Sequence, residues 1–289
     1  ALASKDALAT WLPVDLYVGG AEHAVLHLLY ARFWHMVLYD QGHVPTPEPF
    51  GKLIHQGMIL GEDNQKMSKS RGNVVNPDDV IARFGADTLR VYEMFMGPLE
   101  ATKPWNSEAI GGSKRFLDRC WKLSTMVHEG ADVALDSATK KSVHKTIAKV
   151  TSDIDELKFN TAISAMMVLS KELEKAGAPR EGVEILAKLV HPFAPHLGEE
   201  MWELLGHPPS VQHAGWPVAD AALLVDDEVE IPVQVNGKKR AVLVLAADAT
   251  EEQAMAAAKE DPKVAEALGE GTLRKTIYVP KRILNLIIK

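Results

Sequence analysis

The feature that most constrains the fold is a long stretch, residues 107–205, in which apolar side chains recur at helical spacing. Gly, Pro and Asp residues divide this stretch into segments. Consecutive amphipathic helices with short connections usually pack as an antiparallel bundle. We therefore expect a helical bundle here. Trp105, Trp121 and Trp202 are expected to be core residues, with platforms for base stacking as the alternative. Its predicted helices cover residues 107–128, 137–157, 160–176, 180–190 and 195–205.

The residues before the bundle follow the order strand, helix, strand. Residues 12–18 mix apolar and β-branched side chains and lead into Gly19 and Gly20. Residues 22–41 then have helical spacing, and residues 52–60 have the composition of a second strand. This order is typical of a βαβ unit in a parallel sheet.

A polar loop, residues 61–75, follows the second strand. The next helix has a strong start, because Asn76 is a good N-cap and Pro77 suits the first helical position. This helix should end near Gly85, and we expect Asp87 to cap the helix after it. The loop therefore connects a strand to a capped helix, which is where nucleotide-binding loops lie.

The last part of the chain has a different pattern. Residues 230–235 and 241–245 are expected strands that flank a turn, 236–240, beginning with Asn-Gly. Thr250 and Gln253 form a capping box for a helix. The remaining expected elements are a short helix at 261–269 and strands at 274–279 and 283–288.

Pro-containing linkers at residues 98–104 and 207–218 separate these parts. We predict a multidomain chain with a partial α/β core, then an α-helical bundle, then a small α+β C-terminal domain. The expected domain boundaries are 1–104, 105–218 and 219–289.

Composition limits the function classes. The 289-residue chain has a formal net charge of −7, which argues against a uniformly basic nucleic-acid binder. Residues 231–289 nevertheless carry ten Lys and Arg against seven Asp and Glu, so this part permits local phosphate contact. No apolar run approaches the roughly 20 residues that span a bilayer, and we expect no membrane contact. The lone cysteine, Cys120, excludes a disulfide framework and favours a reducing compartment, for which we expect the cytoplasm.

The clearest chemical motif is Lys66-Met67-Ser68-Lys69-Ser70. Two lysines three residues apart on a short polar loop can place two ammonium groups on one polyphosphate, and the serines add hydroxyl donors. Among these side chains only Met67 favours burial. The alternative is a solvated loop rich in Lys and Ser. The position between a strand and a capped helix favours phosphate binding.

This motif and its surroundings resemble one known family. KMSKS followed by residues 71–77 resembles the second signature of the class I aminoacyl-tRNA synthetases. Other segments resemble the leucyl-type members of that family: 19–24, 27–33, 56–60, 85–90 and 116–121. The resemblance implies the C-terminal half of a Rossmann-type catalytic domain with a stem-contact region, then an anticodon-binding-type bundle, then a tRNA-binding domain.

The resemblance also implies an activity. Class I synthetases of this type activate leucine with ATP, accompanied by Mg²⁺, to leucyl-adenylate and then transfer leucine to tRNA(Leu). The resemblance implies that Lys66, Lys69 and Ser68 act on the phosphates, and that Glu22 binds the ribose. Backbone at residues 58–60 would contact the adenine edge. The nucleotide-binding residues implied in this way are Gly19, Gly20, Glu22, His23, Met58, Ile59, Lys66, Met67, Ser68, Lys69 and Ser70.

His23 and His27 lie four residues apart on one expected helix face, a spacing that can hold a metal ion. No third ligand is evident, and the residues between them fit no zinc motif. We therefore expect no metal site. Glu22 has the alternative of being an ordinary acidic residue in the first turn of a helix.

Several basic residues are candidates for tRNA contact, and the alternative for them is a solvated surface. Two lie with Lys122 on consecutive turns of the first bundle helix. The others are expected to form one basic surface of the C-terminal domain together with Lys281 and Arg282. The expected tRNA-binding residues are Arg115, Arg119, Lys238, Lys239, Arg240, Arg274 and Lys275.

The first class I signature, a HIGH-type sequence, is absent from the chain, as is an editing domain. Half of the expected ATP site and much of the leucine pocket are therefore absent too. We expect the missing N-terminal half in the same longer polypeptide or as a separate subunit, and little or no activation by this chain alone. The alternatives are another class I synthetase, for valine, isoleucine or methionine, and a non-catalytic tRNA-binding module derived from a synthetase.

Overall fold

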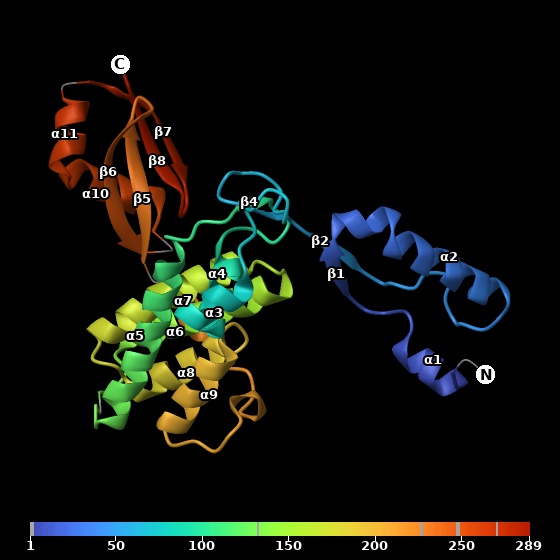
Figure 1. Cartoon of the computed structure of the whole chain (residues 1–289). Coiled ribbons are helices and arrows are strands. Elements are labelled where there is room, and N and C mark those ends of the chain that lie inside the picture. The colour runs from blue at the N-terminus through green and yellow to red at the C-terminus, as the bar shows by residue number, and fades with distance from the viewer. Residues whose placement is uncertain (1–2, 132, 226–227, 247–248, 270) are drawn as a thin grey trace. The chain divides into compact units, whose positions relative to one another are not determined.

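The chain divides into two compact units, Ala1–Ala219 and Asp220–Lys289 (Figure 1). Helices predominate in the first unit, and the second combines helices with a small sheet. The predicted combination of helical and α/β parts is therefore confirmed. None of the helices in the described part of the chain is long and apolar enough to cross a membrane. The computed structural model describes residues 3–131, 133–225, 228–246, 249–269 and 271–289.

The first unit contains the predicted βαβ arrangement near its start. The strands β1 (Tyr17–Gly20) and β2 (Leu53–Gln56) pair in parallel, and α2 (His27–Asp40) connects them (Figure 1). The predicted long helix is divided, since a 3₁₀ turn, η1 (Ala21–Val25), precedes α2. The backbone of Leu26 between them is not helical, with φ −121° and ψ −104°.

The first strand starts later than predicted. The residues just before β1 do not extend it, because Pro13 has no N–H to donate and Val14 forms only an isolated bridge with Phe50. A short helix that the sequence did not indicate, α1 (Lys5–Trp11), precedes them. The Ser4 side chain caps this helix.

The predicted second strand region also divides in two. After β2 the chain continues as β3 (Ile59–Leu60), which pairs in parallel with β4 (Lys103–Pro104) rather than with β1. Gly57 lies at the division, and its N–H donates to the Leu99 carbonyl oxygen at 2.8 Å. The segment expected to be a plain linker, residues 98–104, therefore contributes a strand.

The two helices after the loop begin and end close to their predicted positions. The Asn76 side chain accepts a hydrogen bond from the Asp78 N–H at 3.1 Å and so caps α3 (Pro77–Phe84), as predicted. This helix ends at Gly85, also as predicted, and α4 (Ala86–Phe95) follows at once.

The predicted role of Asp87 is wrong. The helix α4 already begins at Ala86, so Asp87 lies inside its first turn and does not cap it. Its carboxylate instead accepts a hydrogen bond from the Leu197 N–H at 2.7 Å, at the start of α9 (Pro195–Leu204), and lies 2.9 Å from Nδ1 of His196. Asp87 therefore caps a helix that is distant in the sequence.

The predicted bundle is confirmed. It consists of the helices α5 to α9, which lie side by side in Figure 1. The first and last residues of each helix lie within three positions of the predicted ones. The observed bounds are Ile110–His128, Ser137–Asp155, Phe159–Lys175, Arg180–Val190 and Pro195–Leu204.

Two of the three tryptophans predicted to be core residues are buried, Trp105 and Trp202. The prediction for Trp121 is wrong, since this residue is 41% exposed. Cys120 and Leu123 occupy the inward face of α5, and Trp121 lies beside them on a face toward solvent.

The helix α4 is packed on two sides. One face, which includes Tyr92, lies in an apolar cluster that reaches Met67, and the other, which includes Val91, lies in the bundle core. The Tyr92 hydroxyl donates to the Asn106 carbonyl oxygen at 2.8 Å and accepts from the Asn106 N–H at 3.0 Å. The Arg90 guanidinium donates to two carbonyl oxygens in the turn before α9. These contacts join the residues after the polar loop to the bundle.

The described part of the second unit contains a four-stranded sheet in the order β6-β5-β8-β7. The inner strands β5 and β8 are parallel, and the outer pairs are antiparallel. The strands are Glu228–Val235 (β5), Lys238–Ala246 (β6), Leu273–Val279 (β7) and Ile283–Ile288 (β8). The helices α10 (Glu251–Glu260) and α11 (Pro262–Leu268) pack on one face, where Ala258 and Val264 join the core beside Val233.

The predicted Asn-Gly turn is present but shorter than expected. Asn236 and Gly237 have positive φ values of 50° and 78°, as a type I′ turn requires. Lys238, Lys239 and Arg240 belong to β6 and not to the turn. The predicted capping box at the start of α10 is confirmed.

Replacing Asp87 with Ala should destabilise the first unit, because the Leu197 N–H and His196 lose their partner. The loss of this cap should lower the free energy of unfolding by about 1–2 kcal/mol, measured by urea unfolding. The control is Asp118→Ala, which removes an exposed carboxylate paired with Lys114 and should cost less than about 0.5 kcal/mol. Equal losses in the two variants would contradict the capping role.

Burial raises the pKa of Tyr92, so the folded chain holds the phenolic proton more tightly than the unfolded chain does. The stabilisation is therefore complete below the usual tyrosine pKa of about 10 and is lost as the pH rises above that value through the higher pKa of the folded chain. Tyr92→Phe should lower the free energy of unfolding by about 1–2 kcal/mol near pH 8 and by less near pH 11. If the variant and the parent differ in free energy of unfolding by the same amount at both pH values, the phenolic proton of Tyr92 does not contribute to the pH dependence of stability.

Candidate functional site

The KMSKS residues lie on a loop held by two hydrogen-bonded turns. At its base, β3 forms an antiparallel bridge with Lys66, and the Gly61 N–H donates to the Gln65 carbonyl oxygen at 2.9 Å. The second turn begins in the motif and ends just after it, where the Gly72 N–H donates to the Ser68 carbonyl oxygen at 3.2 Å. The loop therefore has a defined backbone path between β3 and α3.

The side chains of the motif have different environments. Met67 is half-buried and packs against the apolar cluster of α4, as its apolar character predicted. Lys66 and Lys69 are exposed, and among the residues that the structure describes neither pairs with a carboxylate. The Ser68 hydroxyl lies 3.2 Å from that of Ser70 and accepts a backbone N–H from three residues on. Two ammonium groups are thus presented to solvent on an anchored loop.

Asp63 and Asn73, to which no sequence pattern assigned a role, also contact this loop. The Asn73 amide nitrogen donates to both carboxylate oxygens of Asp63 at 3.1 Å. The Asn73 amide oxygen accepts a hydrogen bond from the Ser68 N–H at 2.9 Å. Neither residue belongs to a periodic pattern or a capping signal, and the signature-like segment 71–77, which includes Asn73, assigned it no role of its own.

Gly20 and Glu22 lie against one another where β1 ends and η1 begins. A Cβ atom at Gly20 would come 2.3 Å from Oε2 of Glu22, so only glycine permits the carboxylate to take this place. The ring of His23 lies 6.4 Å from that of His27, edge to face. In the described ranges, no group of three or more His, Cys, Asp or Glu side chains is arranged to hold a metal ion.

A cavity of about 1120 Å³ lies beside β2 and β3. Its lining includes four of the residues predicted to bind nucleotide, and it does not include Gly19, His23 or the KMSKS residues. It also takes in residues 52–57 and single residues of distant segments, among them Glu93 and Glu156, which no sequence signal indicated. The four predicted residues in the lining are Gly20, Glu22, Met58 and Ile59.

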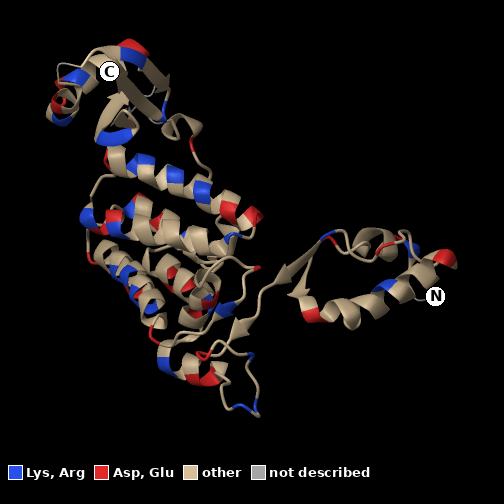
Figure 2. Cartoon of the chain, turned by 90° about the horizontal axis from the view of Figure 1, so that it is seen from above, with Lys and Arg blue, Asp and Glu red and all other residues tan. Residues whose placement is uncertain are grey.

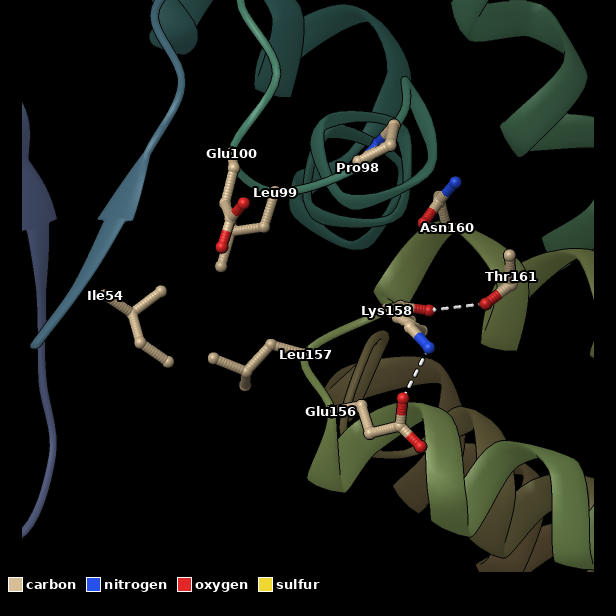
Figure 3. Close-up of a pocket in the computed structure, with 9 residues that line it drawn as sticks. All are labelled: Ile54, Pro98, Leu99, Glu100, Glu156, Leu157, Lys158, Asn160 and Thr161. Carbon is tan, nitrogen blue, oxygen red and sulfur yellow. Dashed lines mark hydrogen bonds and ion pairs between the residues drawn. The ribbon is translucent and has the colours of Figure 1, made fainter. Parts of the chain in front are cut away.

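A smaller cavity of about 370 Å³ adjoins the larger one, since Ile54, Leu99 and Glu156 line both. Figure 3 shows the side chains of Ile54 in β2 and Leu157 in the turn between α6 and α7 pointing toward each other. An ion pair between Glu156 and Lys158 lies at one side. Each cavity is therefore lined by residues of β2 and by residues near Glu156, about one hundred positions later in the sequence.

The backbone beside the larger cavity is held by β4. The Met58 carbonyl oxygen accepts from the Lys103 N–H at 3.0 Å, and the Leu60 carbonyl oxygen accepts from the Trp105 N–H at 2.8 Å. The Lys103 ammonium group donates to the Gly97 carbonyl oxygen at 3.1 Å, and burial lowers the pKa of Lys103. The segment expected to contact adenine is thus fixed in place.

The basic residues of α5 differ in accessibility. Arg115 is exposed. Arg119 donates to the Glu174 carboxylate at 3.2 Å and lies 3.5 Å from the Ser170 hydroxyl. Lys122 pairs with the same glutamate at 2.7 Å, and this hydrogen bond lowers the pKa of Glu174. Figure 2 shows acidic and basic residues interspersed along the bundle helices. Of the three basic residues of α5, Arg119 and Lys122 are engaged in ion pairs with α7.

Five basic residues of the second unit lie at one end of its sheet. They are at the starts of β6 and β7, which are edge strands that run in the same direction, about 14 Å apart across the sheet. Lys281 and Arg282 lie in the turn between β7 and β8, at the opposite end, so their expected place in the same surface is wrong. The five exposed residues are Lys238, Lys239, Arg240, Arg274 and Lys275.

Comparison with known proteins identifies the family. Residues 2–103 match the family model "tRNA synthetases class I (I, L, M and V)", and residues 136–255 match "Anticodon-binding domain of tRNA ligase". Over 286 residues, 99% of its length, the chain is 58% identical to the leucine–tRNA ligase of Sorangium cellulosum strain So ce56. The chain is a homologue of leucine–tRNA ligase, and its parts match the class I tRNA synthetase and anticodon-binding models. The resemblance found in the sequence is thereby confirmed.

Solved structures agree with this assignment. The LeuRS agnB2 of Agrobacterium radiobacter K84, in a ternary complex with tRNA and LeuAMS, matches 96% of the present chain with a TM-score of 0.79 and 32% identity. A Mycobacterium tuberculosis methionyl-tRNA synthetase in complex with methionyl-adenylate matches 69% of it with a TM-score of 0.56 and 20% identity, which shows a shared fold. The chain spans 33% of the curated relative, 38% of the LeuRS and 45% of the methionyl enzyme.

Proposed function

We propose that this chain supplies the KMSKS half of a leucyl-tRNA synthetase. The complete enzyme would convert leucine and ATP to leucyl-adenylate and then transfer leucine to tRNA(Leu). The observation that carries the proposal is the 58% identity to a leucine–tRNA ligase over 99% of the chain. A related LeuRS solved with tRNA and LeuAMS supports the same partners.

The proposed domains are the C-terminal half of a Rossmann-type catalytic domain with a stem-contact region (1–104), an anticodon-binding-type bundle (105–218) and a small tRNA-binding domain (219–289). The boundary between the compact units at residue 219 supports the last division. The match of residues 136–255 to an anticodon-binding model supports a role of the bundle in tRNA binding.

Lys66 and Lys69 are proposed to contact the ATP phosphates. An oxygen of the leucine carboxylate attacks the α-phosphorus, the bond from this phosphorus to the bridging oxygen breaks, and pyrophosphate leaves. No general base is required, because the carboxylate is already a nucleophile. Negative charge grows on the leaving pyrophosphate, so ammonium contacts that strengthen in the transition state accelerate the step. Ser68 and Ser70 add hydroxyl donors, and Met67 anchors their loop.

The adenosine part of ATP is proposed to occupy the larger cavity. The Glu22 carboxylate, beside Gly20, would accept hydrogen bonds from both ribose hydroxyls. Met58 and Ile59 line the same cavity and would contact the adenine. Gly19 and His23, next to these residues in the chain, complete the proposed nucleotide site.

Mg²⁺ is proposed to arrive with ATP. This ion keeps several waters and needs few protein ligands when phosphate oxygens hold it. The described residues contain no cluster of three or more metal-binding side chains. We therefore assign no metal ligand to this chain.

The surface of η1 and α2 supports a second part of the catalytic domain as partner. The crossover helix of a βαβ unit normally buries its apolar face. Here several large apolar side chains are each at least 54% exposed. We assign this surface to the N-terminal half that carries the first class I signature, in the same polypeptide or as a separate subunit. The side chains are Val25, Leu26, Leu29, Tyr30, Phe33 and Trp34.

The tRNA is proposed to contact the basic residues of both units. In the bundle these are Arg115 and Arg119, of which Arg115 is the more accessible because Arg119 is paired with Glu174. In the second unit, the basic end of the sheet offers five exposed side chains to phosphates. They are Lys238, Lys239, Arg240, Arg274 and Lys275.

The proposal is tested by mixing the chain with the N-terminal half of a leucyl-tRNA synthetase and measuring leucine-dependent ATP–pyrophosphate exchange. The mixture should be active and the chain alone should not. Lys66→Ala and Lys69→Ala should each lower kcat by roughly 10²–10³-fold, because each removes transition-state stabilisation. The control is Lys171→Ala, at an exposed position of α7. Exchange by the chain alone, or full exchange in both loop variants, would contradict the proposal.

Charge reversal at the basic end of the sheet should weaken tRNA(Leu) binding without affecting exchange. Replacing Lys238 and Lys239 by Glu should raise Kd about tenfold and reduce the salt dependence of binding, because phosphate contacts are lost. The matched control replaces Lys281 and Arg282, at the opposite end, by Glu. Filter binding at several salt concentrations measures both. If the control variant loses as much affinity for tRNA(Leu), the basic end of the sheet is not a specific tRNA-binding surface.

A further inference from the structure

We propose that Asp63 and Asn73 are positioning residues that hold the KMSKS backbone so that Lys66 and Lys69 meet the phosphates. This inference rests on the function proposed above. Asp63 precedes the motif and Asn73 follows it, so that their side chains join the two arms of the loop. Neither residue is among those expected to contact ATP.

The Asn73 amide contacts the motif on both sides of Met67. Its oxygen accepts the Ser68 N–H at 2.9 Å. Its nitrogen donates to both oxygens of Asp63 at 3.1 Å and lies 3.4 Å from the Lys66 carbonyl oxygen. One side chain thus fixes the backbone that carries the first lysine and leads to the second.

Asp63 closes the turn before the motif. Its Oδ1 accepts the Gln65 N–H at 3.0 Å. The Asn73 amide, helped by this backbone N–H, holds the pKa of Asp63 below its usual value, so the group is an anion at neutral pH. Hydrogen bonds to an ionised acceptor are stronger than bonds between neutral groups.

The end of β3 is shaped to admit this pair. Gly61 is buried, and a Cβ atom there would come 2.7 Å from Oδ1 of Asp63 and 2.8 Å from Nδ2 of Asn73. Any other residue at position 61 would push the pair apart. Glycine is therefore required by the Asp63–Asn73 contact.

This arrangement orders the loop without engaging its lysines. Lys66 and Lys69 are exposed, and each carries a flexible four-carbon stem whose ordering costs conformational entropy. A backbone fixed beforehand lowers the part of this cost that is met when ATP binds. The two ammonium groups remain available because Asp63 pairs with Asn73 and not with them.

Trypsin can test the geometry on the full chain, since Lys66, Lys69 and Arg71 are cleavage sites within the loop. Asn73→Ala should raise cleavage after these residues about tenfold, because the loop opens more often. Cleavage after Lys238 in the second unit should not change, and mass spectrometry resolves the sites. Unchanged loop cleavage would overturn the proposal whatever the activity.

A charge-conserving exchange makes the test specific. Asn73→Asp alone places two carboxylates together and should also open the loop. The double variant Asp63→Asn with Asn73→Asp restores one amide, one carboxylate and the original net charge, and should return cleavage to within about threefold of the parent. Asp79→Ala, which removes an exposed carboxylate from the first turn of α3, is the control. A double variant as open as Asn73→Asp would overturn the pairing.

The same variants are then compared in the active mixture. Asn73→Asp should lower kcat for leucine-dependent exchange about tenfold with a smaller change in KM for ATP, and the double variant should restore most of it. Faster cleavage with full exchange would overturn the positioning role. A parent mixture that shows no exchange would contradict the proposed function and the phosphate role, whereas the cleavage rates still decide whether the pair holds the loop.

Discussion

The packing of α4 on two apolar surfaces is the interaction on which the rest of the first unit depends. Its Tyr92 face supports Met67 and therefore the KMSKS loop, and its Val91 face belongs to the bundle core. Fully burying a large apolar side chain contributes about 1.5–3 kcal/mol, so a helix with two such faces is not easily displaced. Hydrogen bonds from Arg90 to the turn before α9, and from the start of α9 to Asp87, fix the orientation of α4 against the bundle. A loop that is proposed to contact phosphates is thereby attached to a bundle that is proposed to contact tRNA.

Charge is distributed in a way that the net value of −7 conceals. The bundle mixes both signs and uses several basic side chains for ion pairs between its own helices. The exposed lysines of the loop and the basic end of the second unit's sheet are local exceptions. Phosphate contact depends on such local groups and not on the sum over the chain. An acidic protein is therefore compatible with the nucleotide and tRNA contacts proposed for this one.

Much of the fold was predictable because its signals are local. The helices of the bundle, the Asn76 cap, the capping box at Thr250 and the Asn236–Gly237 turn all depend on residues within a few positions. The contacts that were not predicted join distant segments. Asp87 caps a helix that begins more than one hundred residues later, and β3 pairs with β4 rather than with β1.

The candidate site divides in the same way. The KMSKS motif, Gly20 and Glu22 were found from local residue patterns, although their individual roles remain predictions. The walls of the larger cavity come from segments whose proximity only folding determines, as Glu93 and Glu156 illustrate. The contact between Asp63 and Asn73 was not predicted, although Asn73 lies in the signature-like segment 71–77, because two polar residues ten positions apart on a loop carry no periodicity.

The measurement that most directly tests this account combines the chain in turn with N-terminal halves of leucine, isoleucine, valine and methionine enzymes, each with its own amino acid. ATP–pyrophosphate exchange reports whether a complete activation site has formed. We predict exchange with the leucine half and none with the others. Exchange with another half, and none with the leucine half, would contradict it.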